Sequence, residues 1–291
     1  MKRNEPDNGA PSIAKPLARV LAKGKDWSLS EYICSAGPED RPFEEQHRQV
    51  TIAAVIEGSF VYRADNGTSL LHPGGFLLGN PGRCYECGHD HSRGDCCLAL
   101  HVEPCYFEEI AASCTSTSYR FPVGMLPATS DLLPEISMLE ALTASCELML
   151  IEERVPSLIE AVLRVVSGSH PSSARTSARD ERLVSEAFRY IEDHASEALE
   201  LDGLATRAGM SKYHFLRTFR RTAGVTPYQF LLNVRLRRAA VRIATTQTPI
   251  STIAFVEGFG DLSTFNKRFH KMFGVPPNGF RSARLAGESE W

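Results

Sequence analysis

The 291-residue chain lacks any apolar run close to the roughly 18 residues that a membrane-spanning helix needs. Its start, MKRNEPDNGAPSIAKPLARVLAKGK, also lacks the apolar block of a secretory signal. These two absences predict a soluble, cytoplasmic protein with no membrane partner. With 43% hydrophobic and 23% charged residues at this length, we expect an ordinary globular protein of about two domains.

Acidic residues are scarce in the C-terminal third. Between residues 203 and 287 only Glu257 and Asp261 oppose 14 Lys and Arg, although the whole chain has a net charge of −3. A solvated surface with scattered cations should have acids interspersed among them. The concentration of positive charge therefore predicts a nucleic-acid-binding face in this part of the chain.

Cysteine is also missing from the basic part, because all eight cysteines lie between Cys34 and Cys146. In a chain with no export signal we expect them to be reduced. This expectation argues against a disulfide framework.

The organisation of the chain changes near residues 121 and 167. Residues 27–121 read as short strands with turn signals about every 8 to 12 residues, which favours an antiparallel sandwich or barrel. Two amphipathic helical patterns follow, up to Val166, and could cover the core of the β domain or pair with a second subunit. Residues 1–26 are expected to be flexible, and the Ser- and Ala-rich residues 167–179 predict a linker.

Two short helices around a tight turn are predicted in LDGLATRAGMSKYHFLRTFRRTAG. Gly209 permits the turn, and Ser211 can cap the second helix. Phe215 and Phe219 are four residues apart and can anchor that helix in a core. A short helix, a turn and a second helix with Arg on its outer face is the arrangement of a helix-turn-helix, whose second helix enters the major groove of DNA.

The same arrangement recurs in PISTIAFVEGFGDLSTFNKRFHKMFG. Asp261 caps the second helix of this unit, and TPYQFLLNVRLRRAAVRIATT predicts one long connecting helix from Pro227 to about Thr245. A duplicated helix-turn-helix pattern is a far more specific sequence signal for a DNA-binding protein than a single one. The inward-facing positions of the second unit are Ile253, Ala254, Val256, Phe265 and Phe269.

These residues resemble the C-terminal domain of the AraC/XylS family of transcription regulators over residues 181–284, above all in LATRAGMSKYHFLRTFRRTAGVTPYQFLLNVRLRRAAVRI and IAFVEGFGDLSTFNKRFHKMFGVPPNGFR. The resemblance implies a sequence-specific regulator, not an enzyme, that reads two adjacent major grooves of double-stranded DNA and needs no cofactor to do so. RNA polymerase would be a further partner if the protein is an activator.

The resemblance also assigns contacts by position. Each has a structural alternative, since Tyr213 could simply cover its helix and Arg217 could pair with an acid. Leu216 can offer only apolar contact, for example to a thymine methyl. The base contacts are Lys212, Tyr213, Leu216, Arg217, Ser263, Thr264 and Lys267, and the phosphate contacts are Ser211, Arg220, Arg221, Arg268 and Lys271.

The β domain resembles the cupin-like sensor that many members of this family carry, as seen in VIEGSF and LHPGGFLLGNPG. This implies that a small-molecule or metal effector binds there and that the domain contributes to a homodimer. The expected fold is multidomain α+β: a cupin-like β jelly-roll with two trailing helices at 27–166, a linker at 167–179, an all-α domain of two helix-turn-helix units joined by a long helix at 180–285, and a tail at 286–291.

The stretch RCYECGHDHSRGDCCLALH is unusually rich in thiol and imidazole groups, which suit zinc or another soft metal. The candidate ligands are Cys84, Cys87, His89, His91 and Cys96, with Cys97 and His101 nearby. Redox or electrophile sensing is one alternative. The other is a purely structural role, because alternate residues of a strand point to opposite faces and cytosolic cysteines often serve as small core residues.

Two enzyme classes compete with the regulator, a cupin oxygenase and a cysteine-based alkyl acceptor. The oxygenase needs a Glu shortly after its HxH pair, but the nearest acid after His89 and His91 is Asp95. The alkyl acceptor needs an activated cysteine, and Cys84 has no identifiable general base. Both patterns are incomplete, which favours the regulator.

Overall fold

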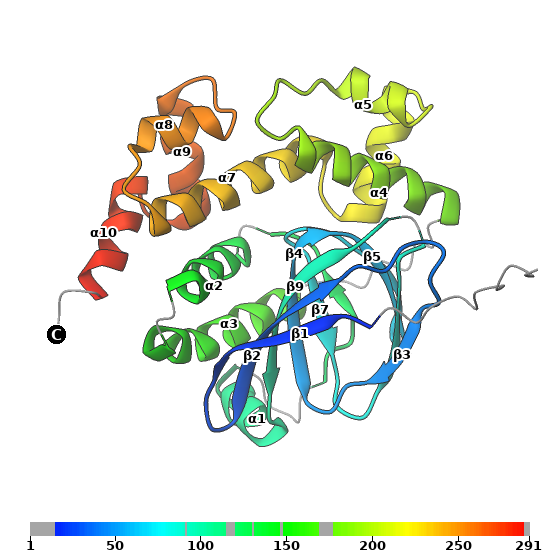
Figure 1. The fold of residues 1–291 in the computed structure, drawn as a ribbon, viewed down its shortest axis with the longest axis vertical. Coiled ribbons are helices and arrows are strands. Elements are labelled where there is room, and N and C mark those ends of the chain that lie inside the picture. The colour runs from blue at the N-terminus through cyan, green and yellow to red at the C-terminus, as the bar shows by residue number, and fades with distance from the viewer. Residues whose placement is uncertain are drawn as a thin grey trace, which may run out of the picture.

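The computed structural model describes residues 15–90, 92–114, 120–129, 131–145, 148–168 and 177–287. Its N-terminal part is a β-barrel flanked by helices, and its C-terminal part is helical throughout the described residues (Figure 1). The strands are β1 (Leu17–Lys23), β2 (Trp27–Cys34), β3 (Phe43–Gln46), β4 (Val50–Gly58), β5 (Phe60–Ala64), β6 (Gly67–Leu71), β7 (Phe76–Gly79), β8 (Cys84–Gly88), β9 (Asp95–Val102) and β10 (Met125–Leu126).

The strands form two facing antiparallel sheets, in the orders β1-β2-β9-β4-β7-β10 and β3-β8-β5-β6. Alternation along β9 separates two cores. Cys97 and Ala99 face the space between the sheets, whereas Leu100 and Val102 pack on the other side, against helices. This arrangement confirms the predicted cupin-like jelly-roll.

Three helices cover the outer face of the larger sheet: α1 (Pro104–Cys114), α2 (Leu133–Ser145) and α3 (Leu148–Gly168). Helix α1 was not expected, because the sequence reads as strands up to residue 121. Helix α3 runs through Pro156, although proline removes one helical hydrogen bond, because Val155 and Leu158 are buried on either side of it. The two trailing helices therefore cover the chain's own core.

Strand β1 lies within the segment that was expected to be flexible. It pairs antiparallel with β2, from Leu17 opposite Ile33 to Lys23 opposite Ser28. Its side chains are mostly exposed, so it carries no alternating apolar pattern that the sequence could reveal. Backbone hydrogen bonds to β2, rather than burial, hold this edge strand, and the expectation of flexibility is wrong for these residues.

The helical part consists of two similar units joined by α7. Each unit has its own aromatic core, built around Phe215 and Phe219 in one and Phe265 and Phe269 in the other. The connecting helix runs from Pro227 to Thr245 as predicted, with a capping box formed by Thr226 and Gln229. The helices are α4 (Ala178–Asp193), α5 (Leu201–Arg207), α6 (Lys212–Ala223), α7 (Pro227–Thr245), α8 (Ile250–Val256), α9 (Leu262–Phe273) and α10 (Pro277–Gly287).

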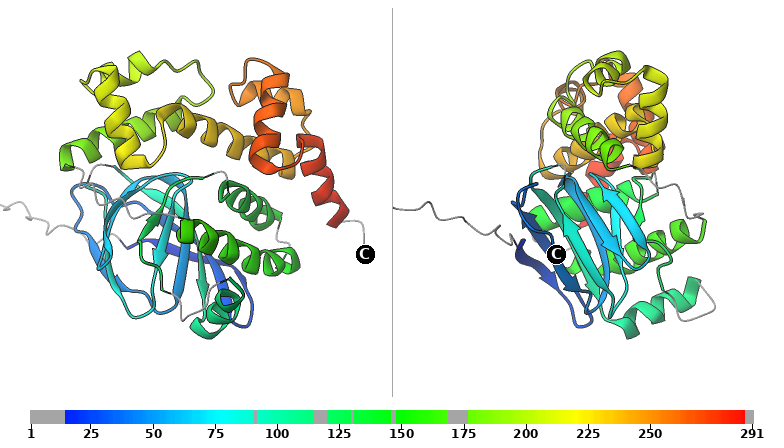
Figure 2. Two further views of the ribbon diagram at one scale, coloured as in Figure 1. Left: turned by 180° about the vertical axis from the view of Figure 1, so that it is seen from behind. Right: turned by 90° about the vertical axis from the view of Figure 1, so that its right-hand side faces the viewer.

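The helical part sits on one end of the barrel, with α7 packed along α2 (Figures 1 and 2). His72 of the barrel packs against both Phe188 and Phe230, and its Nε2 lies 3.2 Å from the carbonyl oxygen of Ala223. Arg237 of α7 donates to Glu140 and to the carbonyl of Ile56, at 2.8 and 2.7 Å. The two parts thus share a packed interface. Residues 169–176 of the predicted linker lie outside the described residues.

Glu192, at the end of α4, gives this region a pH-dependent stability. Burial raises its pKa to about 8, against the attraction of Arg237 and Arg238. The folded protein therefore binds a proton that the unfolded chain releases near pH 4.5, so stability falls as the pH rises between these values. We expect Glu192→Gln to raise the free energy of unfolding above pH 8 by on the order of a few kcal/mol.

The measurement is thermal unfolding at about pH 6 and pH 8.5 for the wild type, Glu192→Gln and the exposed control Glu186→Gln on the same helix. The melting temperature of the wild type and the control should fall across this range, and that of Glu192→Gln should fall less. Parallel decreases in all three proteins would contradict the assignment.

Candidate DNA interface and effector pocket

The first helix-turn-helix unit is α5, a turn at Gly209, and α6. Gly209 has φ of 62°, a conformation that only glycine adopts readily. The hydroxyl of Ser211 accepts the backbone N–H of His214 and caps α6, as predicted, and α6 ends at Gly224 in the left-handed conformation. Phe215 and Phe219 are fully buried, so the opposite face of α6 is free to contact DNA.

The predicted contact residues of α6 lie on its outer face. Tyr213 is 75% exposed, Lys212, Arg217 and Arg220 are exposed, and Leu216 is half-buried. Lys212 forms an ion pair with Asp202, with Nζ 3.0 Å from Oδ1. Arg221 pairs with Asp180 at 2.7 Å, so a phosphate would have to share or replace that carboxylate.

The second unit, α8, a turn and α9, repeats the first. Asp261 accepts the backbone N–H of Thr264 at 2.7 Å, which lowers the pKa of its carboxyl, and Gly274 ends α9 in the left-handed conformation. Val256 was expected to face inward but is 47% exposed, because α8 ends there and Phe259 of the turn fills the core instead. Among the predicted contacts of α9, Arg268 is half-buried and the exposed ones are Ser263, Thr264, Lys267 and Lys271.

Helices α6 and α9 lie on the same side of the molecule, one at each end of α7 (Figure 2, left). Arg235 of α7 helps to fix this arrangement. Its guanidinium donates to the carbonyls of Ala195 and Glu197, which follow α4, and to that of Gly258 in the turn of the second unit, at 2.6, 2.7 and 2.8 Å. One side chain therefore ties the two units together.

Several cations of the basic stretch bind groups of the protein itself. Besides Arg235 and Arg237, Arg242 pairs with the buried Glu257 at 2.7 Å. Arg281 donates to the carbonyls of Ile243 and Thr248, which closes the end of α7 onto α10. The charge count of the sequence therefore overstates the number of cations available to phosphates.

The space between the two sheets contains a cavity of about 100 Å³. Two of its lining histidines bond to tyrosines: the buried His47 lies 2.9 Å from the hydroxyl of Tyr62, and the partly buried His101 lies 3.0 Å from that of Tyr32. Burial, followed by repulsion from His101, lowers the pKa of His47 to about 4. The remaining lining residues include Cys34, Glu45, Phe60, Leu77, Tyr85, Cys87, His89, Asp95, Cys97 and Ala99.

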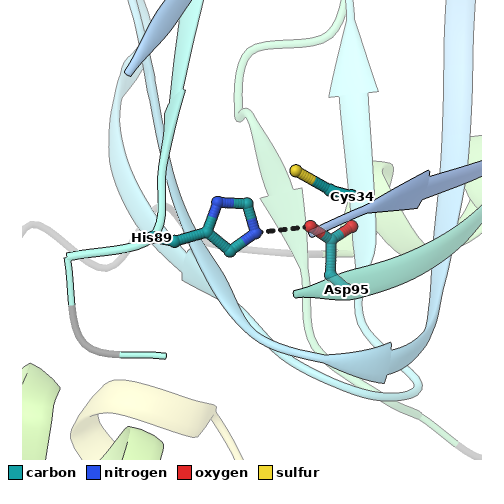
Figure 3. Close-up of side chains that lie close together, drawn as sticks. All are labelled: Cys34, His89 and Asp95. Carbon is teal, nitrogen blue, oxygen red and sulfur yellow. Dashed lines mark hydrogen bonds and ion pairs between the residues drawn. The ribbon is translucent and has the colours of Figure 1, made fainter. Parts of the chain in front are cut away.

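At one end of the cavity, Cys34, His89 and Asp95 present three ligand-type atoms that all lie within 4.8 Å of one another (Figure 3). Nε2 of His89 is 2.6 Å from Oδ1 of Asp95. Burial alone would lower the pKa of His89, but the hydrogen bonds with Asp95 and Cys34 outweigh it and raise the pKa to about 9. This group is the one place in the described residues where three such side chains meet.

Two family models match the chain. One described as "AraC-like ligand binding domain" matches residues 29–170, and one described as "Helix-turn-helix domain" matches residues 204–283. The regulatory protein SoxS of Escherichia coli is 30% identical over 101 residues, 35% of this chain and 94% of SoxS. The chain belongs to the AraC family. It is a transcription regulator with an N-terminal ligand-binding domain and a C-terminal helix-turn-helix domain that binds DNA.

Other similar proteins extend over different parts of this AraC-family chain. The HTH-type regulator YbfI of Bacillus subtilis is 26% identical over 228 residues, 75% of this chain and 78% of YbfI. The DNA-binding domain of AdpA, solved with a target DNA, is 27% identical over 37% of this chain and 97% of its own, with a TM-score of 0.35. ToxT of Vibrio cholerae is 12% identical over 89% of this chain and 98% of its own, with a TM-score of 0.37. None of the described helices is long and apolar enough to cross a membrane.

Of the five metal ligands predicted for this regulator, the four that the structure describes do not all come together. Cys84 is exposed, Cys96 does not line the cavity, and His91 lies outside the described residues. Cys87 and His89 do line it. Cys96 is excluded from the cavity because successive side chains of a strand point to opposite faces. On β9, Asp95 and Cys97 therefore point into the cavity and Cys96 points away from it.

Sequence reasoning missed Cys34, which lies 50 residues before Cys84. It meets the cluster because β2 pairs with β9 in a register that sets Cys34 opposite Asp95. Only a strand pairing deduced in advance could have revealed this contact. The six cysteines whose side chains are described are all free thiols, and burial raises the pKa of Cys87 and Cys97, which weakens them as redox-reactive thiolates.

Proposed function

We propose that this regulator places α6 and α9 in two adjacent major grooves of duplex DNA, and that an effector in the barrel cavity controls its binding. The proposed base contacts are Lys212, Tyr213, Leu216, Arg217, Ser263, Thr264 and Lys267, and the proposed phosphate contacts are Ser211, Arg220, Arg221, Arg268 and Lys271.

One observation carries the proposal: two recognition helices with buried aromatic anchors and polar outer faces stand on one side of the molecule, held apart by a single 19-residue helix. The helix is about 28 Å long at 1.5 Å per residue. Successive major grooves on one face of B-DNA are about 34 Å apart, so the spacing suits two neighbouring grooves.

We further propose residues 27–166 as the sensor and dimerisation domain and residues 180–285 as the DNA-binding domain. The barrel cavity lies between the two sheets and is lined by His47, His101 and Tyr32, which supports an effector site, whether for a small molecule or a metal ion. Contact with RNA polymerase would follow if the protein activates transcription. We also propose that the regulator acts in the cytoplasm.

Arg217→Ala tests the division of labour between the two classes of contact. We expect it to weaken binding to the selected site by about 1 to 3 kcal/mol and to relax preference at one base pair, because arginine discriminates bases by paired hydrogen bonds. Arg221→Ala should weaken all sequences alike. The cognate site is first selected from random duplexes, and affinities are then measured on cognate and scrambled DNA.

The matched control is Arg19→Ala, which removes the same charge from an exposed arginine on β1 of the barrel. It should bind both duplexes as the wild type does. Equal losses on cognate and scrambled DNA for both Arg217→Ala and Arg221→Ala would defeat the assignment of base and phosphate contacts.

A further inference from the structure

Three strands and the turn that follows one of them build the cluster at the end of the cavity. Cys34 ends β2 and Asp95 begins β9, and the two are directly opposite each other in the sheet. His89 follows β8 and points at Asp95 from the other sheet (Figure 3). The side chain of His89 is 1% exposed and that of Asp95 is 9% exposed, so both are withdrawn from solvent.

We propose that Cys34, His89 and Asp95 bind a soft divalent metal ion of the zinc class, and that this ion is the effector of the regulator. The inference rests on the proposed function in that it names the ligand of the same cavity. The set differs from the one that the sequence suggests, since only His89 belongs to both.

The donor chemistry favours zinc, which takes thiolate sulfur, imidazole nitrogen and carboxylate oxygen. In a tetrahedral zinc site, neighbouring nitrogen and oxygen ligands are roughly 3.4 Å apart. Nε2 of His89 and Oδ1 of Asp95 are 2.6 Å apart across a shared proton. A bound ion would replace that proton, and the distance between the two atoms would increase by about 1 Å. Cys34 would lose its thiol proton, because the thiolate is the ligand.

A further thiol lies beside Asp95 but outside the three-residue cluster. Cys97 lies two residues after Asp95 on the inner face of β9, and its Sγ donates to Oδ2 of Asp95 at 3.2 Å. Zinc sites close with four ligands when structural and leave one position open when they exchange a ligand. Cys97 or a water molecule could therefore complete the coordination.

The volume of the cavity favours a metal ion over an organic molecule as the effector. Pockets that hold drug-sized molecules have volumes of about 300 to 1,000 Å³. This cavity has about 100 Å³, which is room for an ion and a few waters. The volume and the donor set thus point to the same class of ligand.

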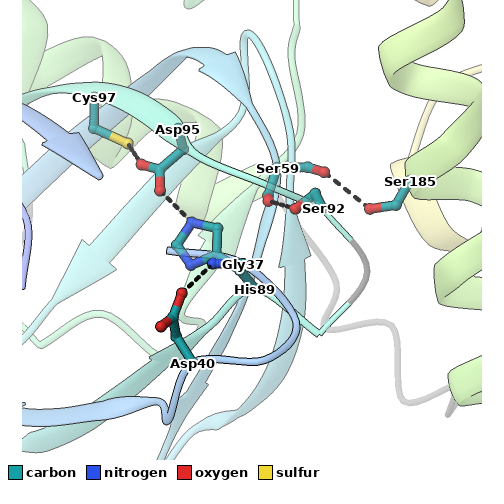
Figure 4. A network of polar contacts seen from close by, with 8 residues as sticks. All are labelled: Gly37, Asp40, Ser59, His89, Ser92, Asp95, Cys97 and Ser185. Atoms are coloured by element: carbon teal, nitrogen blue, oxygen red, sulfur yellow. Dashed lines mark hydrogen bonds and ion pairs between the residues drawn. The ribbon is translucent and has the colours of Figure 1, made fainter. Parts of the chain in front are cut away.

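The turn that carries His89 and Asp95 is tied to the DNA-binding domain (Figure 4). Ser92 in this turn donates to the carbonyl oxygen of Ser59, and the hydroxyl of Ser59 lies 2.9 Å from that of Ser185 on α4. Gly58 has φ of 76° and lies so close to Gly94 that an added Cβ would be 2.3 Å from the carbonyl oxygen of Gly94. A shift of His89 relative to Asp95 therefore acts on a tightly packed turn that is linked to α4 through Ser59.

The first experiment measures metal binding by the full chain purified with chelator. Co²⁺, whose visible absorption reports thiolate coordination, is titrated and then displaced with Zn²⁺. We expect one ion per chain in the wild type, and at least a roughly 100-fold loss of affinity in Cys34→Ser and Asp95→Asn. Cys105→Ser, which changes an exposed cysteine, is the matched control and should bind as the wild type does.

Folding of each variant is checked by circular dichroism and melting temperature, since a ligand variant that fails to fold says nothing about metal. If Cys34→Ser does not fold, Asp95→Asn carries the test, because the exchange keeps size and hydrogen-bonding capacity. No stoichiometric metal in the wild type, or unchanged affinity in a folded ligand variant, overturns the site.

The second experiment measures affinity for the selected duplex with and without Zn²⁺. We expect at least a roughly tenfold change in the wild type and none in Cys34→Ser. Metal binding without any change in DNA affinity overturns the effector role. If the protein binds no metal but still binds the selected DNA specifically, this inference is refuted and the proposed function stands. If the protein binds no DNA specifically, either with or without metal, the proposed function is refuted.

Discussion

Raising the monovalent salt concentration from about 50 to about 200 mM should weaken binding to duplex DNA by about 10² to 10⁴-fold. Each phosphate neutralised by a cation contributes a slope of about −0.9 in the plot of log affinity against log salt. The proposed phosphate cations are Arg220, Arg221, Arg268 and Lys271, which give a slope of about −4. If Lys212, Arg217 and Lys267 also lie near phosphates, the slope is about −6.

The salt dependence also distinguishes the few phosphate contacts proposed from the structure from the larger number that the charge of the sequence would suggest. All 14 cations of residues 203–287 acting on phosphates would give a loss of about 10⁷ to 10⁸-fold over the same range. We expect a smaller loss because Arg235 donates to three backbone carbonyls and the buried Arg237 pairs with Glu140. A nearly flat salt dependence would rule out phosphate-dominated binding, and Arg242→Ala, if it folds, should leave the slope unchanged.

Inserting about five base pairs between the two contacted segments of the selected site should abolish simultaneous contact by both units. The insertion rotates one segment by about half a turn, so that α6 and α9 would face opposite sides of the duplex. Affinity should drop to that of a single unit, which is measured with a duplex that keeps one segment and scrambles the other.

Inserting about ten base pairs provides the control, because it restores the face of the duplex but adds about 34 Å. A rigid α7, braced by the hydrogen bonds of Arg235, cannot span this distance, so we expect binding to stay lost. Full recovery with ten base pairs would show that the two units are flexibly joined and would contradict the role given to α7.

The helical domain was largely predictable because its signals are local. Ser211 and Asp261 cap the recognition helices, Thr226 caps α7, and the buried phenylalanines recur four residues apart. Each signal acts within one or two helical turns, so a single stretch of sequence contains it. The error at Val256 arose where a helix ends, since the helical period no longer decides which way a side chain points.

The barrel was predictable as a class but not in detail. Turn spacing indicates short antiparallel strands, yet the six-stranded order β1-β2-β9-β4-β7-β10 brings together segments far apart in the chain. The edge strand β1 has too little burial to show a pattern, and α1 interrupts a region that reads as strands. Strand order and the burial of an edge strand depend on how distant segments pair in the folded sheet, so the local sequence does not reveal them.

By itself, the sequence determined the duplicated helix-turn-helix, the long helix between its units and the basic character of the DNA-binding domain, because periodicity, capping and charge are properties of contiguous residues. The tertiary structure alone decided which cations remain available to DNA and which thiols meet an imidazole. Cys34 reaches His89 and Asp95 only through the register of β2 with β9, and Arg237 is buried against Glu140 of α2 and the carbonyl of Ile56 of β4. Both contacts join residues distant in sequence, and their energies depend on an interior that exists only once the chain has folded.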